Sequence, residues 1–376
     1  MVDVIIPAYN AHETINNTLM SLAFQRLSSV LDVYIIDDGS SSSYQNNIQY
    51  FLDNKYFKSL HLIHNEKNMG VGFCRKLAIN QSKKITNNPW IFFIDADDYM
   101  ATPYAFNEYL SLADRYPKAK VIYSSLHQEI GDVSTLSGVS TYKSKIMTDA
   151  LGNILYLHGR IYNRSAIEAI KLEFPETRSN EDIAFNLAFF QIYNKPEYII
   201  FDKAQLACTN YNIHSITRSK QSTRGTPENC NSCNEMYDCY ISCKETIEVA
   251  KKALKNRRIL PSCSTLSNFV DKFLFDALKA IGEFGKFPSS EEQELWLLIH
   301  AKYYKDIIIP LLKNSPVGYS FKMQWFHNLS KWELTETPET KEKLKTYLKT
   351  IKTTYNENRF NELASQYLTK NGYYSN

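Results

Sequence analysis

Three carboxylates within four residues, Asp95, Asp97 and Asp98, directly follow an apolar segment, residues 90–94, that is typical of a buried strand. Carboxylates crowded at the end of a strand repel one another and resist burial. A bound divalent cation together with a diphosphate would relieve that repulsion, because hard cations such as Mg²⁺ take carboxylate and phosphate oxygens together. The spacing therefore indicates metal-assisted chemistry on a diphosphate, whereas the simpler interpretation is that these residues cap the next helix.

The carboxylates end the fourth strand in an alternating series of strands and helices. Three earlier strand-like segments each lead into a polar loop: residues 2–6, 33–36 and 60–64. Helical spacing of apolar residues follows the first of them, over 12–24, and Gly70 and Gly72 open another helix that runs through Arg75. This alternation predicts an α/β fold with a mostly parallel sheet covered by helices. Loops at the carboxyl ends of such strands line the ligand crevice, so we expect the four polar loops to meet at one edge.

Length and composition indicate an ordinary globular protein with room for two domains. The net charge of +3 is slight, so charge alone does not make the whole chain a polyanion binder. No apolar run approaches the roughly 20 residues that span a bilayer, and the first residues lack a signal-peptide pattern. We therefore expect a cytoplasmic protein without a transmembrane segment, whose seven cysteines are thiols or metal ligands rather than disulfides.

Four ordered motifs resemble those of family 2 glycosyltransferases of the GT-A fold: Val-Ile-Ile-Pro-Ala-Tyr-Asn-Ala (4–11), Ile-Ile-Asp-Asp-Gly-Ser (35–40), Asn-Met-Gly-Val-Gly (68–72) with Arg75, and Asp-Ala-Asp-Asp (95–98). A fifth element, residues 157–162 with 174–176 and 180–182, is similar to the acceptor-side segment of that family. Tyr211, Asn212, His214, Ser215 and Arg218 resemble its closing segment. The resemblance covers roughly residues 2–219.

The resemblance implies a nucleotide-sugar-binding domain in which an acceptor hydroxyl attacks the anomeric carbon of the donor and inverts it. A divalent metal, Mn²⁺ or Mg²⁺, would assist the leaving nucleoside diphosphate, and a UDP-sugar is the favoured donor. The metal ligands implied are Asp97 and Asp95, with His214 as a third ligand or a diphosphate contact. The donor-binding residues implied are Pro7, Ala8, Tyr9, Asp38, Arg75, Asp95, Asp97 and Asp98.

The acceptor hydroxyl needs a general base, and the resemblance assigns this role to Asp182, with Glu181 beside it as a positioning residue or substitute. The acceptor-side residues implied are His158, Arg160 and Arg218. Simpler structural interpretations exist for these roles. Asp38 also fits ordinary turn chemistry, Arg75 could be a solvated helix residue, and the acidic pair could be first-turn residues favoured by the helix dipole.

The strand–helix alternation ends after the region that resembles the family, and we expect the GT-A domain to comprise residues 1–220. Residues 221–234 are polar and contain Gly225 and Pro227, as expected of a linker. Residues 235–376 have a helical pattern, with a capping box at 289–292 and a first-turn proline, Pro338. We therefore predict a C-terminal helical domain that serves acceptor binding or oligomerisation.

Four cysteines of the C-terminal region lie within a short stretch: Cys230, Cys233, Cys239 and Cys243. The first two form a Cys-x₂-Cys knuckle and the last two lie one helical turn apart, so together they could bind a structural Zn²⁺ in a tetrahedral site. The alternative is that all four are free thiols, with the last two packed on one face of a helix.

Basic residues also gather in this region, at 251–258 and 341–352. Most such runs are solvated helix faces, but these could hold an acidic acceptor such as a polyanionic polymer or nucleic acid. The acceptor is therefore open between a glycan, a polyanion and a hydroxylated DNA base. A non-catalytic nucleotide-binding protein with this fold is a further alternative, which the complete set of carboxylates at Asp95, Asp97 and Asp182 disfavours.

Overall fold

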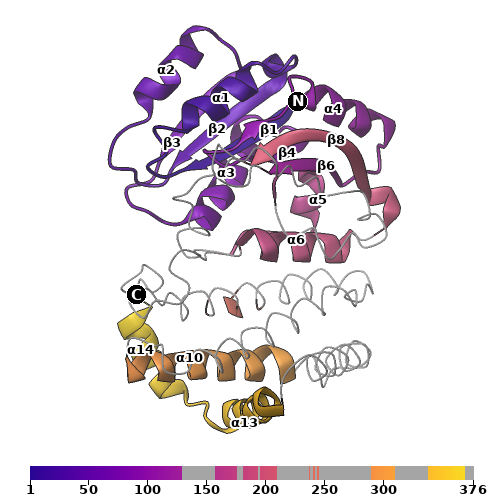
Figure 1. Cartoon of the computed structure of the whole chain (residues 1–376). Helices are drawn as coiled ribbons and strands as arrows, with labels where there is room; N and C mark the ends of the chain where they lie inside the picture. The colour runs from indigo at the N-terminus through magenta and orange to yellow at the C-terminus, as the bar shows by residue number, and fades with distance from the viewer. Residues whose placement is uncertain are drawn as a thin grey trace. The chain divides into compact units, whose positions relative to one another are not determined.

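The computed structural model describes residues 1–128, 157–175, 181–193, 195–209, 289–309 and 338–368, with four helical residues between 237 and 244. The chain divides into two compact units (Figure 1). One unit comprises Met1–Glu176 and Glu181–Asn212, and the other comprises Thr177–Asn180 and Ile213–Asn376. The linker expected at 221–234 lies outside the described residues.

Eight strands of the described residues form one mixed sheet in the first unit, in the order β3-β2-β1-β4-β7-β6-β8-β5. Figure 1 labels six of them, without β5 and β7. Four of these strands are parallel neighbours: β1 (Val2–Ala8), β2 (Leu31–Asp37), β3 (Ser59–His64) and β4 (Trp90–Phe93). β7 (Arg160–Asn163) pairs antiparallel with β4 and with β6 (Val121–Gln128). β8 (Ile199–Thr209) is parallel to β6 and antiparallel to the short β5 (Tyr99–Met100). The parallel half matches the sequence prediction, which did not include the antiparallel strands.

The helices of this unit fill the connections between strands. They are α1 (Ile15–Ala23), α2 (Gln45–Asp53), α3 (Val71–Ile85), α4 (Ala105–Arg115), α5 (Arg164–Ala169) and α6 (Glu181–Ile192), with 3-10 turns η1 (Ser28–Val30) and η3 (Pro196–Tyr198). Every residue of β1, β2 and β4 is buried. Strands covered on both faces read as continuous apolar runs, which is why these three were recognisable in the sequence.

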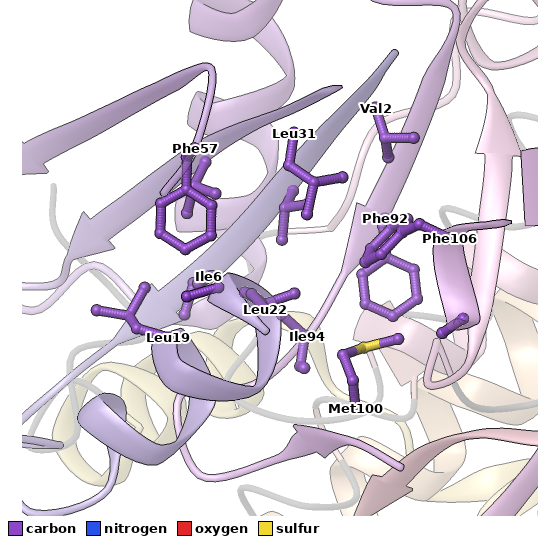
Figure 2. Packing of buried hydrophobic residues seen from close by; sticks show 14 of the residues in the cluster. Val2, Ile6, Leu19, Leu22, Leu31, Phe57, Phe92, Ile94, Met100 and Phe106 are labelled. Carbon is purple, nitrogen blue, oxygen red and sulfur yellow. The ribbon is translucent and has the colours of Figure 1, made fainter. Parts of the chain in front are cut away.

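One face of the sheet carries an aliphatic and aromatic core under α1, α2 and α4. Leu19 and Leu22 of α1 lie near Ile6 of β1, while Phe106 of α4 lies against Phe92 of β4 (Figure 2). All five are fully buried. The apolar positions of α1 recur three and four residues apart, so they share the helix face that packs on the sheet.

The opposite face carries an aromatic cluster made of Phe93, Tyr162, Phe174, Phe185 and Phe189. Phe174 stacks on Phe185 with ring centroids 4.1 Å apart, and Phe93 meets both rings edge-on. Phe185 and Phe189 belong to α6, so the cluster joins this helix to the end of β4. This packing fixes the helix that starts with Glu181 and Asp182 against the strand that leads to Asp95.

A buried ion pair ties β1 to α5 near the amino ends of the parallel strands. Arg164 and Asp3 are both buried and form a salt bridge. Arg164 also donates to the carbonyl oxygen of Asn88 at 2.7 Å, and Asn88 in turn bridges Asp3 and Asp32, 2.7 Å from each. Burial outweighs these partners and raises the pKa of Asp3, so this carboxylate depends strongly on its counter-ion.

Replacing Arg164 with methionine is therefore expected to lower the free energy of unfolding by about 3–5 kcal/mol, because it leaves a buried charge unpaired. Urea denaturation at neutral pH measures the change. Lys83→Met is a suitable control, since it removes a salt bridge between exposed Lys83 and Glu168 (3.1 Å), and exposed pairs contribute about 0–1 kcal/mol. Equal losses in the two variants would contradict the importance of the buried pair.

The described part of the second unit is helical, as the sequence predicts. It contains α10 (Ser290–Tyr303), the π-helical turn η5 (Tyr304–Ile308), α13 (Pro338–Thr353) and α14 (Glu357–Tyr367). The predicted cap is present: the Ser289 hydroxyl accepts a hydrogen bond from the amide of Glu292 at 3.1 Å. The predicted first-turn proline also opens α13.

Lysines on α13 bear on the hypothesis of a polyanionic acceptor. Lys345 and Lys349 are exposed, whereas Tyr347 and Ile351 are buried. Lys343 pairs with Glu339 at 2.6 Å and Lys345 with Glu342 at 3.8 Å, so part of the positive charge is neutralised within the helix. Among the residues described, no helix combines the length and the apolar character needed to cross a membrane.

Candidate functional site

The loops that follow β1 and β2 hold each other in place. The backbone amide of Asn10 donates to the hydroxyl of Ser40 at 2.9 Å, and the Asn10 side chain accepts from the amide of Ser41 at 3.0 Å. The hydroxyl of Tyr44 accepts from the amide of Ala11 at 2.7 Å. Tyr9, which precedes these hydrogen-bonded residues, is 53% exposed. Pro7 and Ala8 are buried at the end of β1. Tyr9 is therefore accessible to a ligand, and the loop that carries it is held by hydrogen bonds.

Asp38 anchors the loop before α3. Its carboxylate accepts from the backbone amides of Met69 and Gly70, each at 2.8 Å, and from the Asn65 side chain at 3.0 Å. Gly39 beside it has φ +73°, and an added Cβ would lie 2.5 Å from the carbonyl carbon of Lys67, so only glycine fits. Asp38 therefore joins two of the polar loops, and its contact with a nucleobase stays a prediction.

Arg75 joins the carboxylates of two distant segments. It is 4% exposed and donates to Asp95 at 2.7 Å and to Glu181 at 2.5 Å. Its guanidinium also lies over the ring of Phe174, 5.7 Å from the centroid. The alternative that Arg75 is a solvated helix residue is therefore wrong. The sequence carried a signal for this, because Arg75 lies on the same face of α3 as the buried Ala78, Ile79 and Ser82.

A close approach at the start of α3 makes this bridge possible. An added Cβ on Gly72 would lie 2.3 Å from the carbonyl oxygen of Pro175 and 3.3 Å from the Cβ of Glu181. A side chain at position 72 would push α3 away from the start of α6. Gly72 therefore brings Arg75, one turn later on α3, within reach of Glu181.

Asp95, Asp98 and His158 form a cluster at the end of β4. The Nε2 atom of His158 lies 3.0 Å from Asp98 and 3.4 Å from Asp95. The ligand atoms of all three residues lie within 4.8 Å of one another, so together they could hold a metal ion. Asp97, the remaining carboxylate of the motif, is half-buried. The backbone carbonyl of Asp98 is fixed by the hydroxyl of Thr18 at 2.7 Å.

The charges of this cluster are strongly coupled. Burial alone would raise the pKa of Asp95, but Arg75 and His158 hold it well below its ordinary value. Burial alone would lower the pKa of His158, but Asp98 and Asp95 raise it well above its ordinary value. Without a bound cation, the imidazolium of His158 and the guanidinium of Arg75 are the positive charges that stabilise these carboxylates.

Sequence reasoning placed His158 on the acceptor side and missed its contact with Asp95. The register of β4 and β7 explains the contact: Trp90 pairs with Asn163, and Phe92 pairs with Ile161. Extending this antiparallel register past the last pair brings His158 opposite Asp95. No local pattern carries this information, because it depends on which strand pairs with β4.

Glu181 and Asp182 occupy the first turn of α6, as the simpler reading of this pair expects. Glu181 is 6% exposed, whereas Asp182 is half-buried. Burial and the neighbouring charge of Asp182 raise the pKa of Glu181 to about 7, against the opposing effect of Arg75. Through Arg75, this acidic pair is joined to the carboxylates at the end of β4. The arrangement could transfer a proton near the group of residues that could hold a metal ion.

Arg160, expected on the acceptor side, is 6% exposed and lies between two aromatic rings, 5.6 Å from the centroid of Tyr123 and 5.9 Å from that of Phe190. Its contact with an acceptor stays a prediction. The other expected site residues, His214 and Arg218, lie outside the described residues. The same holds for the four cysteines of the candidate zinc site, Cys230, Cys233, Cys239 and Cys243.

Comparison with known proteins agrees with the resemblance seen in the motifs. Residues 3–170 match the sequence model of glycosyl transferase family 2. The chain is 21% identical over 344 residues to the uncharacterized glycosyltransferase YibD of Escherichia coli (strain K12). The alignment covers 88% of this chain and 92% of YibD.

Two similar solved structures are of TarS 1–349 from S. aureus. The complex with UDP-GlcNAc has a TM-score of 0.61 and 16% identity, and the match covers 95% of this chain and 93% of that one. The complex with UDP has a TM-score of 0.57 and 16% identity, covering 93% of this chain and 91% of that one. At this identity the likeness shows a shared fold.

Proposed function

We propose that this chain, whose residues 3–170 match the sequence model of glycosyl transferase family 2, is a metal-dependent, inverting glycosyltransferase of the GT-A fold. In this proposal it moves a sugar from a nucleotide-sugar donor to a hydroxyl group of the acceptor. A UDP-sugar is the proposed donor, and the similar folds of TarS in complex with UDP and UDP-GlcNAc support this choice.

The observation that carries the proposal is the Arg75 bridge. It joins Asp95, at the end of β4, to Glu181, at the start of α6. A transfer reaction needs a group that stabilises the leaving diphosphate and a base that meets the incoming hydroxyl, held at a fixed separation. The two carboxylate segments linked through Arg75 supply both kinds of group.

The residues present fit a divalent cation. Asp95, Asp98 and His158 offer two carboxylates and one imidazole within 4.8 Å of one another, and such oxygen and nitrogen ligands suit Mn²⁺. Asp97 is proposed as a further ligand from its place in the motif. When bound, the cation would supply Lewis-acid stabilisation of the leaving nucleoside diphosphate.

The base chemistry falls to the acidic pair on α6. In the proposed step, Asp182 takes the proton of the acceptor hydroxyl while the hydroxyl oxygen forms the new bond to the anomeric carbon. The bond from that carbon to the diphosphate breaks on the opposite face, and the nucleoside diphosphate leaves with the bonding pair. One displacement of this kind inverts the configuration. Glu181, held by Arg75, keeps the first turn of α6 in position.

Replacing Asp97 with alanine is expected to abolish transfer and also the Mn²⁺-dependent tightening of UDP binding. Calorimetry of UDP binding with and without Mn²⁺ measures the second effect. A thermal-shift screen of nucleotide sugars with Mn²⁺ on the wild type identifies the donor first, because a bound ligand raises the stability of the native state. Asp114→Ala, on the exposed face of α4, is the control. Unchanged metal dependence in Asp97→Ala would refute its role as a ligand.

A further inference from the structure

Tyr162 lies where the strand leading to Asp95 meets the helix carrying the acidic pair. It is fully buried in β7, and Ile91 of β4 is its partner in the sheet. Its ring contacts Phe93 of β4, with centroids 5.8 Å apart, and Phe185 and Phe189 of α6 at 5.6 and 5.3 Å. Phe93 is two residues before Asp95, and Phe185 is three residues after Asp182, so the ring packs on both elements that carry the proposed site.

The hydroxyl of Tyr162 adds a directed contact to this packing. It donates a hydrogen bond of 2.6 Å to the side-chain oxygen of Asn186, which is also fully buried. Asn186 is four residues after Asp182, one helical turn along the same face of α6. The phenol therefore restrains the rotation and the axial position of the first turns of α6.

We propose that Tyr162 is a positioning residue for sugar transfer, which acts through Asn186 to hold Asp182 against the donor site. This role rests on the proposed function, in which Asp182 takes the proton of the acceptor hydroxyl. Packing of the rings holds α6 against the sheet, and the buried hydrogen bond of 2.6 Å adds a directional restraint to it. The aromatic cluster holds α6 near the sheet, and the hydroxyl fixes its register.

Tyr162→Phe tests this role, because it removes the hydroxyl and keeps the ring. A base displaced by about 1 Å loses up to about 10²-fold in rate, so we expect kcat to fall by about 10–10²-fold. The KM for the donor should stay near the wild-type value, since the donor loops lie on other elements. A merely structural role would lower only the fraction of folded enzyme. We therefore calculate kcat per UDP-binding site, and a merely structural role would then leave kcat at the wild-type value.

Tyr34→Phe is the matched control. Tyr34 is fully buried in β2, and its hydroxyl bonds to that of Thr86 at 2.8 Å, so the variant loses a comparable bond away from α6. A double-mutant cycle with Asn186→Ala adds a second test: if both residues act through one bond, the double variant should be no slower than the slower single variant. A kcat for Tyr162→Phe equal to that of Tyr34→Phe, or strictly additive losses in the cycle, would overturn the proposal.

The experiment separates this inference from the function on which it rests. A wild type that transfers no sugar from any donor would contradict the proposed function. An active wild type with an equally active Tyr162→Phe would contradict only the positioning role. Amide hydrogen exchange supplies a readout without turnover: the first two turns of α6 should exchange faster in Tyr162→Phe than in Tyr34→Phe, and equal exchange in the two variants would count against the inference.

Discussion

Asp182→Asn is expected to lower turnover by about 10²–10⁴-fold, the usual contribution of a positioned general base, while donor binding stays nearly intact. Asparagine preserves the size and hydrogen bonding of the side chain but cannot take a proton. Asp182 is the more exposed member of the acidic pair, so it is better placed than Glu181 to meet an acceptor. Donor affinity should persist because Asp182 lies on α6, whereas the loops after β1 and β2 carry proposed donor contacts.

Steady-state kinetics with the identified donor, together with calorimetric binding of UDP, measure the two effects separately. Asp114→Asn makes the same chemical change at an exposed site on α4 and should leave both quantities unchanged. Glu181→Gln completes the set. If Asp182→Asn turns over normally and Glu181→Gln does not, then Glu181 is the base, and its pKa of about 7 suits that role.

Arg75→Met is expected to lower the free energy of unfolding by about 3–5 kcal/mol, because it leaves Asp95 and Glu181 without the cation they share. Arg75 is 4% exposed, and its guanidinium makes an ion pair with each carboxylate. Methionine fills a similar volume, so the loss reflects charge rather than a cavity. Turnover should fall as well, since the bridge between the two halves of the site is gone.

The loss of unfolding free energy caused by Arg75→Met should grow as the pH rises. In the wild type, the lowered pKa of Asp95 contributes stability that is present above its ordinary range and is lost in acid. Glu181 acts in the opposite sense, since its pKa is raised from 4.5 to about 7 and stability falls across that interval. Without Arg75 both carboxyls hold protons to higher pH in the native state. The stability of the variant should therefore decline more steeply than that of the wild type between about pH 5 and 8.

Urea denaturation of the variant and the wild type at about pH 5 and about pH 8 measures this difference in unfolding free energy. Lys76→Met is a control on the same helix, because Lys76 pairs with exposed Glu173 at 3.0 Å, and such pairs contribute about 0–1 kcal/mol. A loss in Arg75→Met that is independent of pH would show that packing rather than charge accounts for it. A loss no larger than that of Lys76→Met would refute the bridge as a stabilising element.

The sequence by itself determined the parallel half of the sheet and the edge where the site lies. Buried parallel strands are continuous apolar runs, so β1, β2 and β4 could be located within a few residues. Alternation with helices then requires their carboxyl ends to face one edge. The sequence therefore predicts that the loops of Asp38 and Asp95 lie at the same edge of the sheet. Local signals also fixed the cap at Ser289 and the start of α13 at Pro338.

Only the tertiary structure decided which charges meet at that edge. Arg75 and Glu181 are separated by 106 residues, and the contact between them depends on the close approach at Gly72. His158 reaches Asp95 only because β7 pairs antiparallel with β4 in one register. Helical and strand periodicity report which face of an element is buried, but they carry no information on which distant element covers that face. For that reason the sequence identified the candidate carboxylates of this protein, whereas their contacts with Arg75 and His158 depend on the tertiary structure.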